Sequence, residues 1–142
     1  MIKRMTWSFV PDRPIYLQLQ DILKLSIVSG QQPPGSKLPA VRDLAIEAAV
    51  NPNTVQRALA ELERDGLVHA QRTSGRFVTE DTEVIGKMKN ELAMELVEAF
   101  LKKMAAIGYG AREAASLIAG KAANSAESAD SAERSVDSYV NS

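Results

Sequence analysis

The stretch that decides the fold is Val41-Arg-Asp-Leu-Ala-Ile-Glu-Ala-Ala-Val-Asn-Pro-Asn-Thr-Val-Gln-Arg-Ala-Leu-Ala-Glu-Leu62. In its first part, apolar residues at three- and four-residue spacing predict a short helix that ends at about Ala49. A second helix follows a tight turn, because Asn51 is placed to cap it and Pro52 occupies a first-turn position, where a missing N–H costs nothing. This helix turns Val55, Ala58, Leu59 and Leu62 inward and ends at Gly66. Two short helices joined in this way predict a helix-turn-helix.

The flanking sequence extends this unit on both sides. Before it, apolar residues from Ile15 to Ile27 recur with helical spacing and stop at Gly30. After it, residues 67–71 and 76–79 are short extended runs around the turn Arg72-Thr-Ser-Gly75. Three helices followed by a β-hairpin predict a winged helix-turn-helix over residues 1–80, a mainly α fold with a small β-hairpin.

The rest of the chain has a different character. Residues 84–107 predict a long amphipathic helix, Gly108-Tyr-Gly110 breaks it, and a shorter helix runs from Ala111 to about Ala119. We therefore expect a two-helix segment over residues 81–120. Residues 121–142 are rich in serine and alanine, and the pattern leaves open whether this tail is disordered or extends the helix.

The apolar stripe of the long helix favours dimerisation. One winged helix is too small to cover so long an apolar face, whereas the same face on a second copy covers it. The alternative is that the helix folds back on its own winged helix. The residues expected at the dimer interface are Ile85, Met88, Leu92, Leu96, Phe100, Ile107, Leu117 and Ile118.

Composition excludes several classes of site. The 142 residues contain no cysteine and one histidine, so neither a disulfide scaffold nor a thiolate metal site is expected. No strand–turn–helix elbow carries a candidate nucleophile, and Gly108-Tyr-Gly110 lacks the third glycine of a nucleotide-binding loop. We therefore expect no enzymatic activity, no cofactor and no metal. The absence of a long apolar run and of a signal peptide predicts a cytoplasmic protein that does not contact a membrane.

The charge of the chain divides unevenly. Residues 1–80 hold ten Lys and Arg against eight Asp and Glu, and residues 81–142 hold seven against ten. An excess this small does not identify a nucleic-acid binder, so the positions of the basic residues must carry that inference.

Those positions fit DNA contact by the second helix of the pair, whose first turns enter the major groove in a helix-turn-helix. Asn53, Thr54, Gln56 and Arg57 all carry side chains able to form hydrogen bonds, and amide side chains can pair with adenine and arginine with guanine. Two alternatives to DNA contact stay open. The polar side chains at the start of the helix could only satisfy its free N–H groups, and Arg57 could form an ion pair with Glu61, one helical turn later.

Basic residues outside this helix support the same interpretation. Arg42 stands in the first turn of its helix, where a cation opposes the helix dipole, so contact with DNA explains it better than helix stability does. In the hairpin, Arg72 and Arg76 flank a tip in which Gly75 permits close approach to the minor groove or its phosphates. The alternative is a solvated hairpin. His69 is expected to pack on the hairpin.

The motifs Leu38-Pro-Ala-Val-Arg-Asp-Leu-Ala45, Val50-Asn-Pro-Asn-Thr-Val-Gln-Arg-Ala-Leu59, Glu61-Leu-Glu-Arg-Asp-Gly-Leu-Val68 and Gly75-Arg-Phe-Val78 closely resemble the winged helix of the GntR family. The resemblance covers roughly residues 11–79. It implies a bacterial transcription regulator that binds palindromic operators as a dimer, with Arg42, the Asn53–Thr54 region, Gln56 and Gly75 near DNA. Many members have arginine at positions 52 and 56, so their base preferences do not transfer. The Asn-Pro-Asn-Thr motif and the short helical tail resemble the YtrA-like branch.

These inferences together predict a homodimeric repressor whose partner is double-stranded DNA, and they leave open an unidentified small-molecule effector. Two rival hypotheses are a non-specific architectural DNA-binding protein and a winged helix that binds another protein. The first predicts a steep salt dependence without sequence preference, and the second predicts that loss of Arg42 and Arg57 leaves activity intact.

Overall fold

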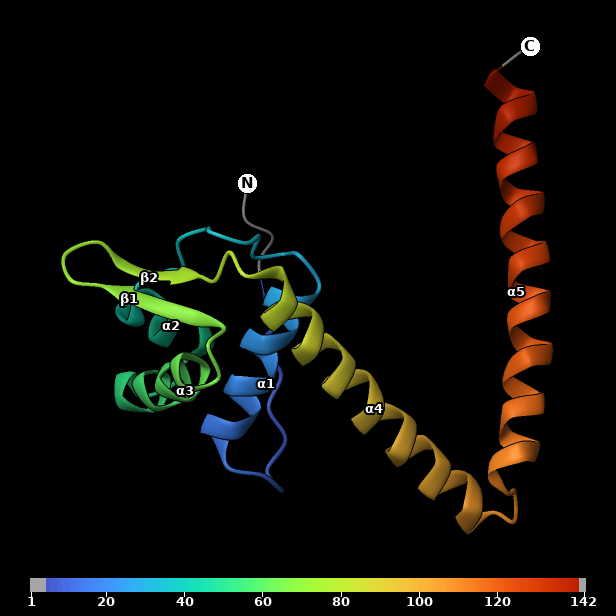
Figure 1. Cartoon of the computed structure of the whole chain (residues 1–142), viewed down its shortest axis with the longest axis horizontal. Helices are drawn as coiled ribbons and strands as arrows, with labels where there is room; N and C mark the ends of the chain where they lie inside the picture. The colour runs from blue at the N-terminus through green and yellow to red at the C-terminus, as the bar shows by residue number, and fades with distance from the viewer. Residues whose placement is uncertain (1–4, 141–142) are drawn as a thin grey trace. The chain divides into compact units, whose positions relative to one another are not determined.

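The computed structural model describes residues 5–140, and the side chains of residues 5–126. The elements, in chain order, are α1 (Ile15–Val28), α2 (Val41–Ala48), α3 (Pro52–Arg64), β1 (Val68–Gln71), β2 (Gly75–Val78), α4 (Thr82–Ala106) and α5 (Ala111–Val140). Helices α1 and α2 both pack against α3, and the β1–β2 hairpin follows α3 and contacts it through β1 (Figure 1). The predicted winged helix-turn-helix is therefore confirmed.

The core lies between the three helices and the hairpin. Every residue expected to face inward on α3 is buried, because the helical spacing of these side chains places them on one face. Side chains of the hairpin and of the segment before α1 complete the core. Its fully buried large side chains include Leu19, Leu23, Ile27, Leu44, Val55, Leu59, Leu62, Leu67 and Val78.

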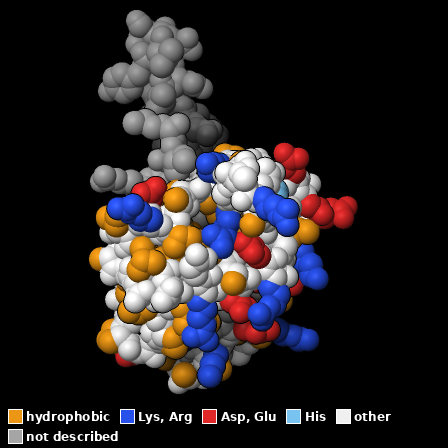
Figure 2. Space-filling view, turned by 90° about the vertical axis from the view of Figure 1, so that its left-hand side faces the viewer, with side chains coloured by type: hydrophobic (Ala, Val, Ile, Leu, Met, Phe, Trp, Pro, Cys, Tyr) orange, Lys and Arg blue, Asp and Glu red, His pale blue; other side chains and the backbone are white. Residues whose placement is uncertain are grey.

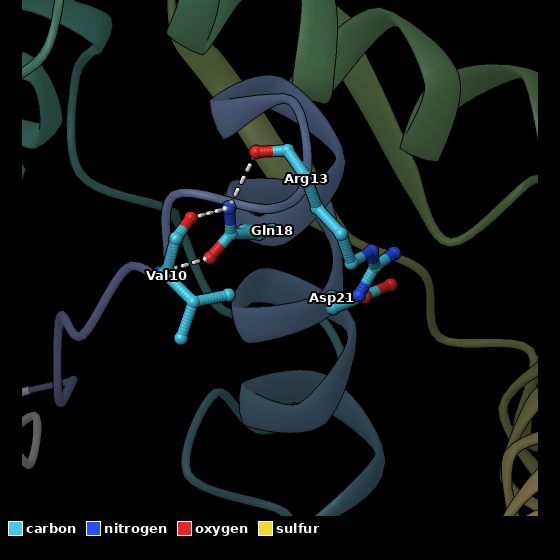
Figure 3. Close-up of polar contacts among 4 residues, drawn as sticks. All are labelled: Val10, Arg13, Gln18 and Asp21. Carbon is cyan, nitrogen blue, oxygen red and sulfur yellow. Dashed lines mark hydrogen bonds and ion pairs between the residues drawn. The ribbon is translucent and has the colours of Figure 1, made fainter.

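The segment before α1 is part of the core, which the sequence analysis did not predict. Met5 is buried, and Trp7 and Phe9 pack against the core. The buried side chain of Gln18 fixes the end of this segment: its Oε1 accepts from Val10 N at 2.7 Å, and its Nε2 donates to Val10 O, also at 2.7 Å (Figure 3). Nε2 also donates to Arg13 O at 2.7 Å, so one amide holds the approach to α1 at three points.

The turn between α2 and α3 depends on one strained residue. Ala49 ends α2 in the left-handed conformation, with φ 56° and ψ 46°, and the following N–H of Val50 donates to Ala45 O at 3.0 Å. An L-residue with a Cβ pays about 1 kcal/mol to adopt this conformation, whereas glycine does not.

We expect Ala49→Gly to raise the free energy of unfolding by about 0.5–1 kcal/mol, measured by urea denaturation. The matched control is Ala60→Gly, at an exposed position within α3, which is expected to lower it by about 1 kcal/mol. A loss of stability in Ala49→Gly as large as in the control would contradict this account of the turn.

The wing is a two-stranded antiparallel hairpin in which Val68 pairs with Val78 and Gln71 with Gly75. The loop before α2 lies along the second strand: Gly35 N donates to Val78 O at 3.0 Å and Leu38 N to Arg76 O at 2.9 Å. These bonds tie the wing to the loop that leads into α2.

The chain divides into two compact units, residues 1–92 and 93–142. In the first, Val84, Ile85 and Met88 at the start of α4 pack against the core of the winged helix. Two residues of the predicted dimer interface, Ile85 and Met88, thus pack within their own chain. For these two residues, the contact is the one expected from the alternative in which the helix packs on its own winged helix. Leu92 is half-buried.

In the second unit, the remainder of α4 turns at Gly108, where φ is +97°, into α5. Ala114 is fully buried there, whereas Leu96, Phe100, Ile107, Leu117 and Ile118 of the predicted dimer interface are exposed.

Helix α5 does not end near Ala119 but continues to Val140. Gly120 keeps a negative φ and lies inside the helix, and the many alanines that follow it have the highest helix propensity. Residues 141–142 of the predicted tail lie outside the described residues. Within the part of the chain that the structure describes, no helix is long and apolar enough to cross a membrane.

Candidate nucleic-acid interface

The first turn of α3 has the geometry that the sequence predicts. Asn51 caps the helix, since its Oδ1 accepts from Asn53 N at 2.8 Å, and Pro52 is the first helical residue. With the inward face buried, the side chains of Asn53 and Gln56 are exposed and that of Thr54 is half-buried. Polar groups able to donate and accept hydrogen bonds therefore line the outer face of this turn.

Arg57, one residue further on, is exposed but held in place. Its guanidinium carbon lies 3.6 Å from the centroid of the Tyr16 ring, within range of a cation–π contact. Among the described residues Arg57 forms no ion pair with Glu61, which instead accepts from Arg64 at 3.3 Å. Tyr16 is a contributor to this site that the sequence analysis missed, since it lies 41 positions away on α1.

Arg42 lies in the first turn of α2 and is exposed. Among the described residues it forms no ion pair within 4.0 Å. Asp43, its neighbour, is the acidic residue that the helix dipole favours in this turn. A cation at this end of the helix without an acidic partner remains available to a phosphate or a base edge.

The two arginines of the wing differ in their surroundings. Arg72 is exposed at the hairpin tip. Arg76 is turned back onto α3, where its Nε donates to Glu63 Oε1 at 2.7 Å and its Nη2 to Gln56 Oε1 at 2.9 Å. The sequence pattern alone gave Arg76 the same role as Arg72, because it could not show this contact between the wing and α3.

Gly75 gives the hairpin tip its shape. Its φ is +101°, and a Cβ at this position would lie 3.1 Å from Lys37 Cε. Lys37 is exposed and belongs to the loop before α2, so it adds a cation beside the tip that the sequence analysis did not select. A groove of about 300 Å³ separates the tip from the start of α2 and is lined by Lys37, Leu38, Pro39, Ala40, Val41, Thr73, Ser74, Gly75 and Arg76.

His69 is exposed on β1 and stacks on Phe77 of β2, with ring centroids 6.1 Å apart and an interplanar angle of 21°. This contact gives it the packing role expected from the sequence. Within the described residues, no group of three or more histidine, aspartate or glutamate side chains is arranged to hold a metal ion.

Figure 2 views the molecule from the side of Figure 1 on which the β1–β2 loop lies. Lysine and arginine side chains are spread over this face, with acidic side chains among them. The mixture agrees with the small net charge of residues 1–80. Attraction to phosphates alone is therefore modest, and discrimination between DNA sequences depends on individual side chains.

Comparison with known proteins identifies the family. Residues 15–78 match the family model of bacterial regulatory proteins, gntR family. The uncharacterized HTH-type transcriptional regulator YhcF of Bacillus subtilis is 41% identical over 106 residues, which are 75% of this chain and 88% of that protein. The chain belongs to the GntR family.

Further relatives agree with this assignment. The HTH-type transcriptional repressor YtrA of Bacillus subtilis is 40% identical over 92 residues, which are 61% of this chain and 71% of that protein. A GntR family transcriptional regulator from Listeria monocytogenes has a similar structure, with a TM-score of 0.73 and 35% identity over 79% of this chain and 98% of that chain. This GntR-family protein is thus a DNA-binding transcriptional regulator, and its likeness to that structure extends beyond residues 15–78.

Proposed function

We propose that the protein is a homodimeric repressor that binds a palindromic operator through α3 and the wing. The observation that carries this proposal is the outer face of α3, where Asn53, Thr54 and Gln56 surround the capped first turn. The base edges of the major groove present donors and acceptors that such side chains match. The full set of proposed DNA contacts is Arg42, Asn53, Thr54, Gln56, Arg57, Arg72, Gly75 and Arg76.

Exposed apolar side chains in α4 and α5 support the dimer. Leu96 is 72% exposed and Ile107 is 70% exposed in the single chain, and Phe100, Leu117 and Ile118 are exposed with them. Large apolar groups gathered in one segment mark an interaction surface, and a twofold axis buries the same surface on both copies. The proposed interface therefore begins after Met88, which is half-buried against the core of the winged helix.

A dimer explains how a protein of this size recognises a specific site. Two copies of α3 enter successive major grooves when they are about 34–36 Å apart, so the operator has two related half-sites. Occupation of such a site at a promoter blocks transcription, and the repressor YtrA, similar over most of its own length, supports this direction of regulation.

The test is fluorescence anisotropy of the purified protein on the duplex upstream of its own gene, at about 150 mM salt. A shuffled duplex of equal composition is the control, and we expect the upstream duplex to bind at least ~10³-fold more tightly. Equal binding to both, with a steep salt dependence, would support the architectural alternative instead. No binding to either, or to a randomised duplex library, would favour a protein-binding winged helix.

A further inference from the structure

Arg76 connects the wing to two residues of α3 that lie on the same face of that helix. Glu63 and Gln56 are seven residues apart, which is close to two turns, so both side chains project toward the hairpin. Arg76 Nε lies 2.7 Å from Glu63 Oε1, and Arg76 Nη2 lies 2.9 Å from Gln56 Oε1. One guanidinium therefore bridges a carboxylate and an amide.

This contact fixes the orientation of the Gln56 amide. Arginine only donates hydrogen bonds, so the Gln56 atom that faces Nη2 is the carbonyl oxygen and not the nitrogen. The amide nitrogen, with two N–H donors, then points away from Arg76. A free glutamine presents a donor and an acceptor together, whereas Gln56 directs donors outward and shares its carbonyl with a cation.

The orientation matters because purines differ in their major-groove edges. Adenine presents the N7 acceptor beside the N6 donor, and a glutamine pairs with it through both atoms of its amide. Guanine presents two acceptors, N7 and O6, which suit donors. The Arg76–Gln56 contact occupies one of the two acceptor sites of the Gln56 carbonyl and leaves both amide donors free, so the pair offers more donors than acceptors, which suits guanine better than adenine.

We propose that Arg76, anchored by Glu63, is a positioning residue that makes Gln56 select guanine over adenine at the base pair it contacts. This inference rests on the proposed placement of Gln56 against base edges. It assigns Arg76 a different role from that of Arg72, which lies exposed at the hairpin tip and is proposed to reach the minor groove or its phosphates.

The anchor keeps Arg76 directed toward Gln56 at the proposed DNA surface. Its side chain is 25% exposed and that of Glu63 is 33% exposed, so water only partly screens the ion pair. Arg76 also lies in the paired part of the hairpin, opposite Ala70, and its carbonyl accepts from Leu38 N. Both the backbone and the side chain of Arg76 are thus held before DNA binds.

The experiment is selection of bound sequences from a randomised duplex library, carried out with the full chain and its variants. Gln56→Ala identifies the base pair that Gln56 contacts, because preference is lost at that position alone. Dissociation constants are then measured on two duplexes that carry G·C or A·T there. We expect the wild-type protein to prefer guanine by about tenfold or more, the range of one well-formed base contact.

Arg76→Met removes the donors and keeps the length of the side chain, and we expect adenine then to bind as well as guanine or better. Arg76→Lys is the second variant; its ammonium replaces two separate guanidinium nitrogens by one, so we expect a shift in the same direction but smaller than in Arg76→Met. Arg72→Met is the matched control, which lowers affinity for both duplexes by a similar factor and leaves their ratio unchanged. Thermal melting followed by circular dichroism shows whether each variant folds.

Three results overturn the inference. One is an unchanged ratio of the two dissociation constants in folded Arg76→Met, which would make Arg76 a backbone contact. The second is a Gln56→Ala variant that loses preference at no position, while the wild-type protein still selects a site. The third is a wild-type preference for adenine. Failure of the wild-type protein to select any sequence would instead refute the proposed function.

Discussion

Leu96→Glu is expected to convert the proposed dimer into a monomer and to abolish specific DNA binding at protein concentrations of about 1 μM. Leu96 is 72% exposed in the single chain and lies within the proposed interface. Burial of a leucine contributes about 1.5–3 kcal/mol, and a twofold interface loses two of them, so the dimer weakens by about 3–6 kcal/mol. This loss corresponds to about 10²–10⁴-fold in the dimer dissociation constant, before the cost of burying two carboxylates is added.

Light scattering after size-exclusion chromatography measures the mass, and anisotropy on the selected operator measures binding. Ala105→Glu is the matched control, because position 105 lies half a revolution from Leu96 on the same helix and is exposed. We expect it to remain dimeric. A Leu96→Glu protein that stays dimeric and binds its operator normally would place the interface elsewhere.

The second large effect is expected for Arg42→Ala, which should weaken operator binding by about 10–100-fold. Arg42 is exposed in the first turn of α2 without an acidic partner among the described residues. A base contact by an arginine discriminates by about 1–3 kcal/mol, and a phosphate contact adds attraction that depends on salt. The free energy of unfolding should stay unchanged or rise slightly, since a cation at this helix end opposes the dipole.

Arg64→Ala is the control for this variant, because Arg64 is a highly exposed arginine at the C-terminal end of α3, far along that helix from the proposed contacts in its first turn, and is paired with Glu61. It should bind the operator within about twofold of the wild-type protein. Equal losses in the two variants would mean that Arg42 acts only through the overall charge. A salt series on Arg42→Ala then distinguishes the two kinds of contact: loss of a phosphate contact reduces the salt dependence of binding, whereas loss of a base contact leaves it unchanged.

Local features of this fold were predictable from the sequence. The Asn51 cap, Pro52 at the first helical position and the glycine after α3 act within a few residues, so their spacing alone indicates a helix and its ends. The inward positions of α3 follow from the period of the helix. The long α5 was harder, because a serine- and alanine-rich sequence has helix propensity but few large apolar groups that would anchor it.

Contacts between distant residues were not predictable. Arg76 meets Glu63 and Gln56 only because the hairpin folds against α3, and nothing in the sequence of the wing distinguishes Arg76 from Arg72. Likewise, Met5, Trp7 and Phe9 belong to the core through tertiary packing and not through any helical period. The apolar stripe of α4 is divided in the same way: its first residues pack against the winged-helix core, and its later residues are left for the proposed dimer. Where this division falls depends on how far along α4 the core reaches, which the helical period does not show.

The stacking of Arg57 on Tyr16 has a consequence for the thermodynamics of DNA binding. A long side chain that is free before binding loses rotamer entropy when it is immobilised, at a cost of about 0.5–1.5 kcal/mol. In this protein the aromatic ring restricts the guanidinium already in the free state. Part of the rotamer entropy of Arg57 is therefore lost during folding, and the proposed contact of Arg57 with DNA would cost correspondingly less entropy on association, with Tyr16 of α1 as the preorganising group.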